Sequence, residues 1–316
     1  AAYKEGAASL HRYPDGGAQA LVRAIGEVQG LDPARIVCGA GSDELLALLG
    51  RAYAGPGDEV LYSAHGFLMY PIIALSLGAT PVKAPEADLT ANVDNLLAAV
   101  TPKTRIVFVA NPNNPTGTML PATELRRLRA GLPADVLLVI DAAYAEYVDD
   151  PGYDAGAALV DEGAATVMTR TFSKIHGLAA LRIGWCYAPA EIAAVLNRIR
   201  GPFNVGAPAI AAGAAAVRDV GHVERSRAHN RVERKRLADR LAQLGLVGPE
   251  SHGNFLLVPF ADPATAEAAL AALNAAGVIP RRVAGYGLPE CLRITVGTAA
   301  ENDKVVAALT DFVGGA

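Results

Sequence analysis

Lys174 lies among residues whose side chains can bind an anion. Hydroxyl groups precede it at Thr171 and Ser173, and a guanidinium group follows at Arg182. The runs on either side are apolar and predict buried strands, where an unpaired ammonium group costs several kcal/mol. A lone lysine is by default a solvated surface residue, but these neighbours favour an anion pocket that contains an amine. Such an amine can lose its proton near neutral pH and attack a carbonyl carbon, forming a Schiff base.

A second candidate anion site follows the predicted strand 35–38. The turn Gly39-Ala40-Gly41 leads through Ser42 and Asp43 into a predicted helix, and free amides at a helix N-terminus bind anions. The dinucleotide fingerprint is incomplete, because Glu44 stands where a third glycine is needed. The alternative is a tight connection that Ser42 or Asp43 caps.

Two more polar side chains follow predicted buried strands. The strand 136–141 ends in Asp141, and the strand 104–110 leads to Asn114 within the turn 111–117. Ligands of open α/β sheets bind at the carboxyl ends of the strands. A carboxylate buried there needs a cationic partner, such as a protonated pyridine nitrogen. The amine, the anion pocket and this carboxylate together indicate pyridoxal phosphate, whose aldehyde reacts with a lysine.

The C-terminal part of the chain has a different pattern, typical of a small α+β domain. Its predicted strands are 254–258, 277–281 and 291–296, and its predicted helices are 263–276 and 299–312. Arg293 lies within the last strand, where a buried guanidinium group needs a carboxylate or phosphate partner. We therefore expect an N-terminal segment 1–30, a large cofactor-binding domain 31–222 and a small domain 223–316.

Composition excludes several classes of protein. With 316 residues, 52% hydrophobic and 19% charged, the chain can bury a large core and is not expected to be disordered. The net charge of -4 argues against nucleic acid as a partner. Three scattered cysteines match neither a disulfide framework nor a metal site, which favours a reducing cytoplasm. No apolar run is long enough to span a membrane and no signal peptide opens the sequence, so neither a membrane nor a metal is expected.

The stretch 171–185 resembles the cofactor-lysine signature of fold-type I pyridoxal-phosphate aminotransferases. Ser173-Lys174 is followed by Gly-Leu-Ala and then by Arg182-x-Gly184, and the wording is most similar to histidinol-phosphate aminotransferases. The resemblance covers nearly the whole chain. It implies an α/β fold: an aspartate-aminotransferase-like, three-layer large domain with a mostly parallel sheet, and a smaller α+β C-terminal domain. It also implies pyridoxal 5'-phosphate as the cofactor.

The resemblance assigns roles residue by residue. Lys174, Asp141 and Tyr144 are the expected catalytic residues. Tyr13 of the Arg-Tyr-Pro turn would reach the cofactor phosphate of the other subunit in a homodimer, which implies dimer contacts for the segment 1–30, although Tyr13 is alternatively a packing aromatic. The full expected cofactor-binding set is Tyr13, Ser42, Asp43, Phe67, Asn114, Asp141, Tyr144, Thr171, Ser173, Lys174 and Arg182. The expected substrate-binding set is Asn114, Arg281 and Arg293.

The sequence departs from the family pattern at three places. Ala142 replaces a glutamate that many relatives carry, and Arg281-Arg282 stands where relatives have Arg-Pro, which leaves open which arginine faces the pocket. Relatives also carry a Ser-x-Asn-Glu-Asn-Pro segment that helps close the substrate pocket, and the sequence here begins after that segment.

The expected reaction is transamination between L-histidinol phosphate and 2-oxoglutarate, in histidine biosynthesis. An aromatic amino-acid aminotransferase and a threonine-phosphate decarboxylase are alternatives on the same scaffold. A dehydrogenase built on the turn Gly39-Ala40-Gly41 would leave Lys174 without a role. A non-catalytic, cofactor-binding regulator would leave the complete catalytic set unexplained.

Overall fold

The computed structural model describes residues 1–163 and 165–315 and is built on a seven-stranded sheet. Its strands, in spatial order, are β1 (Ile36–Gly39), β9 (Gly184–Tyr187), β8 (Thr166–Thr171), β7 (Leu137–Asp141), β6 (Thr104–Ala110), β2 (Glu59–Ser63) and β3 (Thr80–Ala84). The pairs from β3 to β8 are parallel, and β9 runs antiparallel to both of its neighbours. Both faces of such a sheet are covered, which explains the continuous apolar strands of the sequence.

Alternating side chains of the central strands enter different layers of the core. Ile106 and Phe108 of β6 pack on one face of the sheet, whereas Val107 and Val109 pack on the other. This alternation is the period of two residues that a strand imposes.

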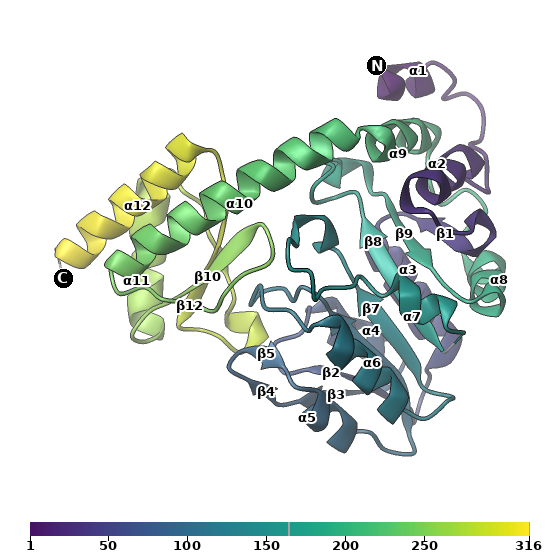
Figure 1. Cartoon of the computed structure of the whole chain (residues 1–316), viewed down its shortest axis with the longest axis horizontal. Helices are drawn as coiled ribbons and strands as arrows, with labels where there is room; N and C mark the ends of the chain where they lie inside the picture. Colours follow the sequence, from purple (N-terminus) through teal and green to yellow (C-terminus); the bar gives the residue numbers. More distant parts are fainter. Residues whose placement is uncertain (164, 316) are drawn as a thin grey trace.

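Helices cover both faces and complete a three-layer α/β fold (Figure 1). One face packs against α3 (Ser42–Tyr53), α4 (Met69–Ser76) and α8 (Ala190–Ile199). The other face packs against α2 (Gln19–Gln29), α5 (Val93–Ala98), α6 (Ala122–Gly131), α7 (Ala157–Asp161) and α9 (Ala207–Arg218). The short α1 (Ala2–Ala7) contacts α9, and β4 (Glu86–Ala87) pairs with β5 (Thr90–Ala91).

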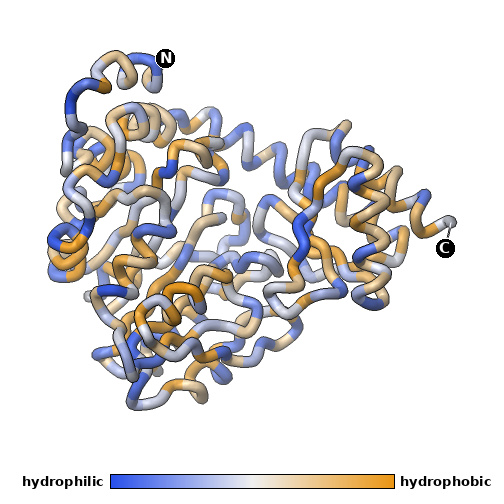
Figure 2. Tube along the Cα trace, turned by 180° about the vertical axis from the view of Figure 1, so that it is seen from behind, coloured by the Kyte–Doolittle hydropathy of each residue, from blue (hydrophilic) through white to orange (hydrophobic). Residues whose placement is uncertain are grey.

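The C-terminal part is a separate small α+β unit. Its sheet has the order β10 (Phe255–Pro259), β12 (Cys291–Thr295) and β11 (Arg281–Arg282), and its helices are α11 (Pro263–Ala275) and α12 (Ala299–Gly314). The long helix α10 (Val220–Gln243) joins this unit to the large sheet (Figure 1). Figure 2 shows the linking stretch of α10 largely in hydrophilic colours, as expected for a helix with a solvated face.

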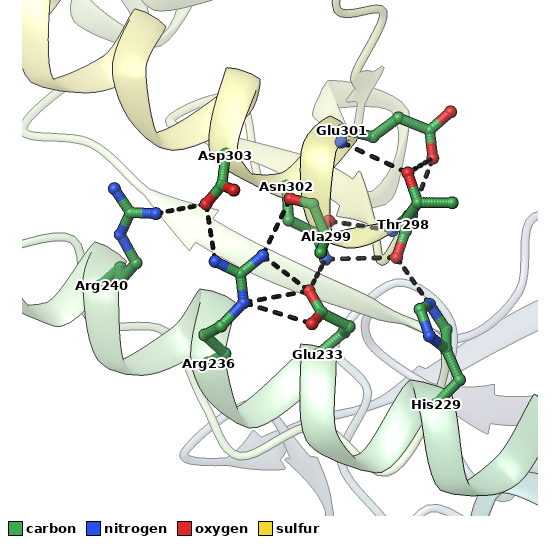
Figure 3. Close-up of polar contacts among 10 residues, drawn as sticks. His229, Glu233, Arg236, Arg240, Thr298, Ala299, Glu301, Asn302 and Asp303 are labelled. Carbon is green, nitrogen blue, oxygen red and sulfur yellow. Dashed lines mark hydrogen bonds and ion pairs between the residues drawn. The ribbon is translucent and has the colours of Figure 1, made fainter.

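A polar network holds α10 against α12 (Figure 3). Arg236 donates hydrogen bonds to Glu233 on its own helix and to Asp303 on α12. Asn302, which is 1% exposed, donates to the same Glu233 carboxylate at 2.8 Å. These bonds, together with the apolar contacts of Leu237 and Leu241, attach the second half of α10 to the small unit.

One strand of the small unit is shorter than predicted. The predicted strand 277–281 is wrong for its first four residues, because only Arg281 and Arg282 pair with β12; Gly277 has a φ of +76° and Pro280 has no amide hydrogen. The division at residues 222 and 223 stays a prediction, and it falls within the first turn of α10. No helix in residues 1–163 and 165–315 is long and apolar enough to cross a membrane.

Replacing Gly184 with alanine should destabilise the protein at the contact between β9 and the start of α3. A Cβ atom there would lie 2.3 Å from the backbone nitrogen of Ser42 and 2.5 Å from the carbonyl carbon of Gly41. Such overpacking against backbone should cost about 2 kcal/mol or more, measured as a lower Tm. The control is Gly201→Ala, whose Cβ would meet its nearest neighbour at 3.7 Å; equal Tm values for the two variants would contradict the prediction.

Candidate active site

A cavity of about 250 Å³ opens at the carboxyl ends of the parallel strands. It is lined by ten of the residues predicted to bind the cofactor and by small neighbours such as Ala110 and Ala179. The predicted residues that line it are Ser42, Asp43, Phe67, Asn114, Asp141, Tyr144, Thr171, Ser173 and Lys174, with Arg182 as the tenth. Segments up to 140 residues apart in sequence therefore meet here because parallel strands end at one edge.

Asp141 is the buried carboxylate of the cavity. It is 4% exposed, and it accepts hydrogen bonds from Tyr70 Oη at 3.1 Å and from Thr169 Oγ1 at 3.0 Å. Burial raises its pKa to about 6, although these two hydrogen bonds and the charge of Lys174 act in the opposite direction. The carboxylate is therefore held in place by neutral donors, and a cation next to it would favour its ionised form.

The opposite wall of the cavity carries hydrogen-bond donors. Helix α3 begins at Ser42, so its free amides and the hydroxyl of Ser42 face the cavity. Arg182 reaches across from the end of the lysine turn, 3.4 Å from both Ser173 Oγ and Asp43 Oδ2. Gly41 has a φ of +88°, and a Cβ there would lie 2.6 Å from Arg182 Nη2, so the glycine turn allows the guanidinium group to approach.

Lys174 is half-buried between this wall and Asp141. It follows β8 in the turn toward β9, and its Nζ lies 5.1 Å from the centre of the Tyr144 ring. Tyr144 packs edge-on against Phe255 of the small unit, with ring centres 5.2 Å apart. The amine is therefore placed within the cavity and not in bulk solvent.

The small unit contributes its arginines next to this cavity. Arg293 donates to Asn114 Oδ1, and Asn114 Nδ2 donates to Tyr286 Oη at 3.2 Å. The Nε of Arg293 is buried and has no partner among the described residues. Arg281 lies opposite Arg293 in the register of β11 and β12, so the two side chains share one face of the sheet.

Arg282 points the other way. It pairs with Leu292 in the register and forms an ion pair with Glu267 of α11. Burial raises the pKa of Tyr286, against the nearby positive charges of Arg293 and Arg281. Arg281 is therefore the arginine on the side of the cavity.

Tyr13 is the one residue of the predicted cofactor-binding set that is not among the residues lining this cavity. It is 83% exposed and stacks on Phe203, with ring centres 4.6 Å apart. Its predicted role toward a second subunit stays a prediction.

The sequence reasoning missed three contributors to the site. Tyr70 and Thr169 hold Asp141, and Tyr286 holds Asn114. A weak signal existed for two of them, because Thr169 is two residues before Thr171 on the same face of a strand and Tyr70 is one helical turn after Phe67. Tyr286 had no local signal, since it comes from the other unit of the chain.

Replacing Asp141 with asparagine should change how the stability of the cofactor-free protein depends on pH. The folded-state pKa of about 6 exceeds the ordinary value of 3.8, so the ionised carboxylate disfavours folding, and this loss develops as pH rises from 4 to 6. Relative to wild type, Asp141→Asn should gain about 3 kcal/mol in free energy of unfolding between pH 4 and pH 7. Asp149→Asn, at an exposed position, should track wild type; parallel curves for Asp141→Asn and wild type would refute the prediction.

Known proteins resemble this chain over nearly its full length. The family model "Aminotransferase class I and II" matches residues 3–309. A histidinol-phosphate aminotransferase of Paramagnetospirillum magneticum is 61% identical over 310 residues, covering 98% of this chain and 85% of the relative. One of Rhodospirillum rubrum is 58% identical over 311 residues, covering 98% and 84%.

Solved structures agree. The histidinol-phosphate aminotransferase of Sinorhizobium meliloti, in complex with pyridoxal-5'-phosphate, superposes with a TM-score of 0.93 at 30% identity, covering 99% of this chain and 86% of that one. The aspartate aminotransferase of Thermus thermophilus with maleate shares the fold, with a TM-score of 0.84 at 22% identity over 98% and 87% of the two chains. The expected aspartate-aminotransferase-like fold is confirmed, and the chain belongs to the class I and II aminotransferase family.

Proposed function

We propose that this chain catalyses the pyridoxal-phosphate-dependent transfer of an amino group between L-histidinol phosphate and 2-oxoglutarate. The observation that carries the proposal is the single cavity that brings together Lys174, Asp141 and Arg182. The names of the relatives at 54–61% identity support the same substrate.

The residues of the cavity fit pyridoxal phosphate at both ends. Asp141 is a buried carboxylate whose hydrogen-bond donors are the neutral groups of Tyr70 and Thr169, which leaves a protonated pyridine nitrogen as a suitable partner. At the other end, the start of α3, Ser173 and Arg182 supply donors for a phosphate. Lys174 lies between them, as the aldehyde requires.

When bound, the cofactor supplies a ring that withdraws the electron pair left on the α-carbon of the amino donor. Lys174 Nζ is the base that removes the α-proton and the acid that returns a proton. Asp141 would accept a hydrogen bond from the ring nitrogen and keep that nitrogen protonated. Tyr144 and Asn114 would donate to the phenolic oxygen and Phe67 would stack on the ring, while Thr171 lines the pocket beside Ser173.

The two substrates would meet different arginines. The buried Nε of Arg293 has no partner among the described residues, and this side chain fits the carboxylate of 2-oxoglutarate, because a guanidinium group binds carboxylates in pairs of hydrogen bonds. Arg281 lies on the same face and fits the phosphate of histidinol phosphate. This second cation favours a phosphorylated donor over the aromatic amino acids of an aromatic aminotransferase.

Tyr13, near the start of the sequence, and Phe203, which follows α8, form an exposed aromatic pair. We infer that this pair contributes to the contact of a homodimer, in which Tyr13 reaches the phosphate site of the other subunit. We also place the enzyme in the cytoplasm, which suits its three free, buried cysteines.

Assays with three amino donors and 2-oxoglutarate test the substrate. The value of kcat/KM should be at least about tenfold higher for L-histidinol phosphate than for phenylalanine or threonine phosphate. Faster turnover of phenylalanine would establish the aromatic aminotransferase instead. Release of carbon dioxide from threonine phosphate would establish the decarboxylase.

Replacing Lys174 with alanine should lower turnover by about a thousandfold or more, because the variant lacks the base for the α-proton. The visible absorbance band of the bound cofactor should also be lost. The control is Lys103→Ala, at an exposed position that does not line the cavity, and it should behave as wild type. Turnover and colour retained in Lys174→Ala would remove the basis of the proposal.

Arginines 281 and 282 form a matched pair for testing the phosphate site. Arg281→Ala should lower kcat/KM for histidinol phosphate by about ten- to a hundredfold, since a hydrogen bond to a charged group contributes about 1.5–3 kcal/mol. Unphosphorylated histidinol should react equally with wild type and this variant. Arg282→Ala removes only an exposed ion pair with Glu267 and should change little; the reverse ranking would assign the phosphate to Arg282.

A further inference from the structure

Three polar side chains form a buried cluster on the far side of the segments that carry the catalytic residues. Glu146 Oε1 accepts a hydrogen bond from Arg170 Nη2 at 2.7 Å and lies 3.7 Å from His176 Nε2. The side chains of Arg170, Glu146 and His176 are only 8%, 10% and 7% exposed. We refer to them as the Arg170–Glu146–His176 cluster.

Each member of the cluster is one or two residues from a residue of the active site. Glu146 is two residues after Tyr144, and His176 is two residues after Lys174. Arg170 follows Thr169, the residue of β8 that donates a hydrogen bond to Asp141. Because neighbouring side chains of a strand point to opposite faces, Arg170 faces away from Asp141. The cluster therefore connects the segments 144–146, 169–170 and 174–176 on the side that faces away from the active-site cavity.

The contacts around the cluster restrict it further. The Arg170 guanidinium lies 5.6 Å from the ring centre of Trp185, and the His176 ring packs on Phe172 with centres 4.8 Å apart. Burial alone would raise the pKa of Glu146, but Arg170 and His176 outweigh it and lower the pKa to about 2. Glu146 is therefore a fixed negative charge at neutral pH.

Helix α10 holds the same two segments by their backbones. Arg227 Nε donates to the carbonyl oxygen of Glu146 at 2.7 Å, and His222 Nε2 lies 3.0 Å from the carbonyl oxygen of Ile175. All three members of the cluster line a second cavity, and the other ionisable groups that line it are Arg227 and Glu224 of α10 and Tyr153. The segments of Tyr144 and Lys174 are thus fixed both to each other and to the helix that carries the small unit.

Stability alone is a poor reason for such a cluster. Removing two charges from water costs several kcal/mol, and a buried ion pair can often be replaced by apolar residues without loss of stability. A shared carboxylate does, however, set the spacing of the groups that contact it. Here the carboxylate of Glu146 sets the distance between its own segment, which carries Tyr144, and the segments of its two partners. His176 is on the segment that carries Lys174, and Arg170 is next to Thr169, which donates the hydrogen bond to Asp141.

We propose that Glu146, through its shared contacts with Arg170 and His176, is a positioning residue that fixes Lys174 and Tyr144 relative to Asp141. The proposal rests on the proposed function, because it concerns the residues that would hold pyridoxal phosphate. Its effect should appear in cofactor binding and in the chemical step, and much less in KM for the substrates.

The first test changes His176 in two ways. His176→Phe keeps a ring that can pack on Phe172 but loses the contact with Glu146, whereas His176→Gln keeps a hydrogen-bond donor. Titration of the cofactor-free proteins with pyridoxal phosphate should show about tenfold weaker binding for His176→Phe and recovery to within about threefold for His176→Gln. The pH midpoint of the visible absorbance of bound cofactor should move by about half a unit in His176→Phe only, and kcat should fall more than KM changes.

The second test measures the coupling to Glu146. Glu146→Gln alone would leave Arg170 as an unpaired buried charge, so the background is Glu146→Gln with Arg170→Met, which removes both charges. In this background His176→Phe should have less than about a twofold further effect on cofactor binding. The control is Tyr187→Phe, which removes a 2.7 Å hydrogen bond to Asp161 from a buried side chain of β9 and should leave cofactor binding unchanged.

The outcomes separate this proposal from the function on which it rests. Wild type that fails to bind pyridoxal phosphate would overturn the proposed function. Wild type that binds it, with His176→Phe showing the same affinity and the same pH midpoint, would overturn the positioning role alone. So would equal effects of His176→Phe in the two backgrounds, or an equal loss of cofactor affinity in Tyr187→Phe.

Discussion

The arrangement of the site depends on the buried carboxylate of Asp141 and on the groups that interact with it. Asp141 stands at the carboxyl end of β7, in the middle of the large sheet, where it is only 4% exposed. The hydrogen bonds from Tyr70 and Thr169 fix its orientation, yet its pKa remains above the ordinary value. A cation at this point is the partner that would relieve the cost of burial. The cavity beside it has the hydrogen-bond donors to take a molecule that brings such a cation at one end and a phosphate at the other.

The sheet explains why the polar residues of the site come from distant parts of the sequence. Parallel strands all end at one edge, and the loops that follow β1, β2, β6, β7 and β8 are the segments that reach the cavity. Strand β9 runs antiparallel to β8, so the chain turns back directly after Lys174. The side chain of Arg182 therefore lies next to Ser173, on the same side of the cavity. Glycines at positions 41 and 184 permit the close backbone approach that this return requires.

The small unit completes the site from the other side. Arg293 and Tyr286 both contact Asn114, and Phe255 packs on Tyr144. These contacts cross from β10, β12 and the turn between β11 and β12 to the loops of the large sheet. Helix α10 joins the two units through its own contacts with residues 146 and 175. The helix that packs on the small unit, to which Arg281 and Arg293 belong, therefore also contacts the segments of Tyr144 and Lys174.

Much of this could be predicted from the sequence, because it depends on local chemistry. Each of the main motifs can be recognised from a short stretch of sequence. They are the apolar strands that end in Asp141 or lead to Asn114, the glycine turn before Ser42 and the stretch around Lys174. Their resemblance to one family indicates the fold. Which arginine of the pair 281 and 282 faces the cavity depends on the register between β11 and β12, which no local pattern specifies. The pairing of Tyr70 with Asp141, of Tyr286 with Asn114 and of Glu146 with Arg170 and His176 likewise needed the tertiary structure, since side chains 24 to 172 residues apart meet only when the sheet and the small unit are assembled.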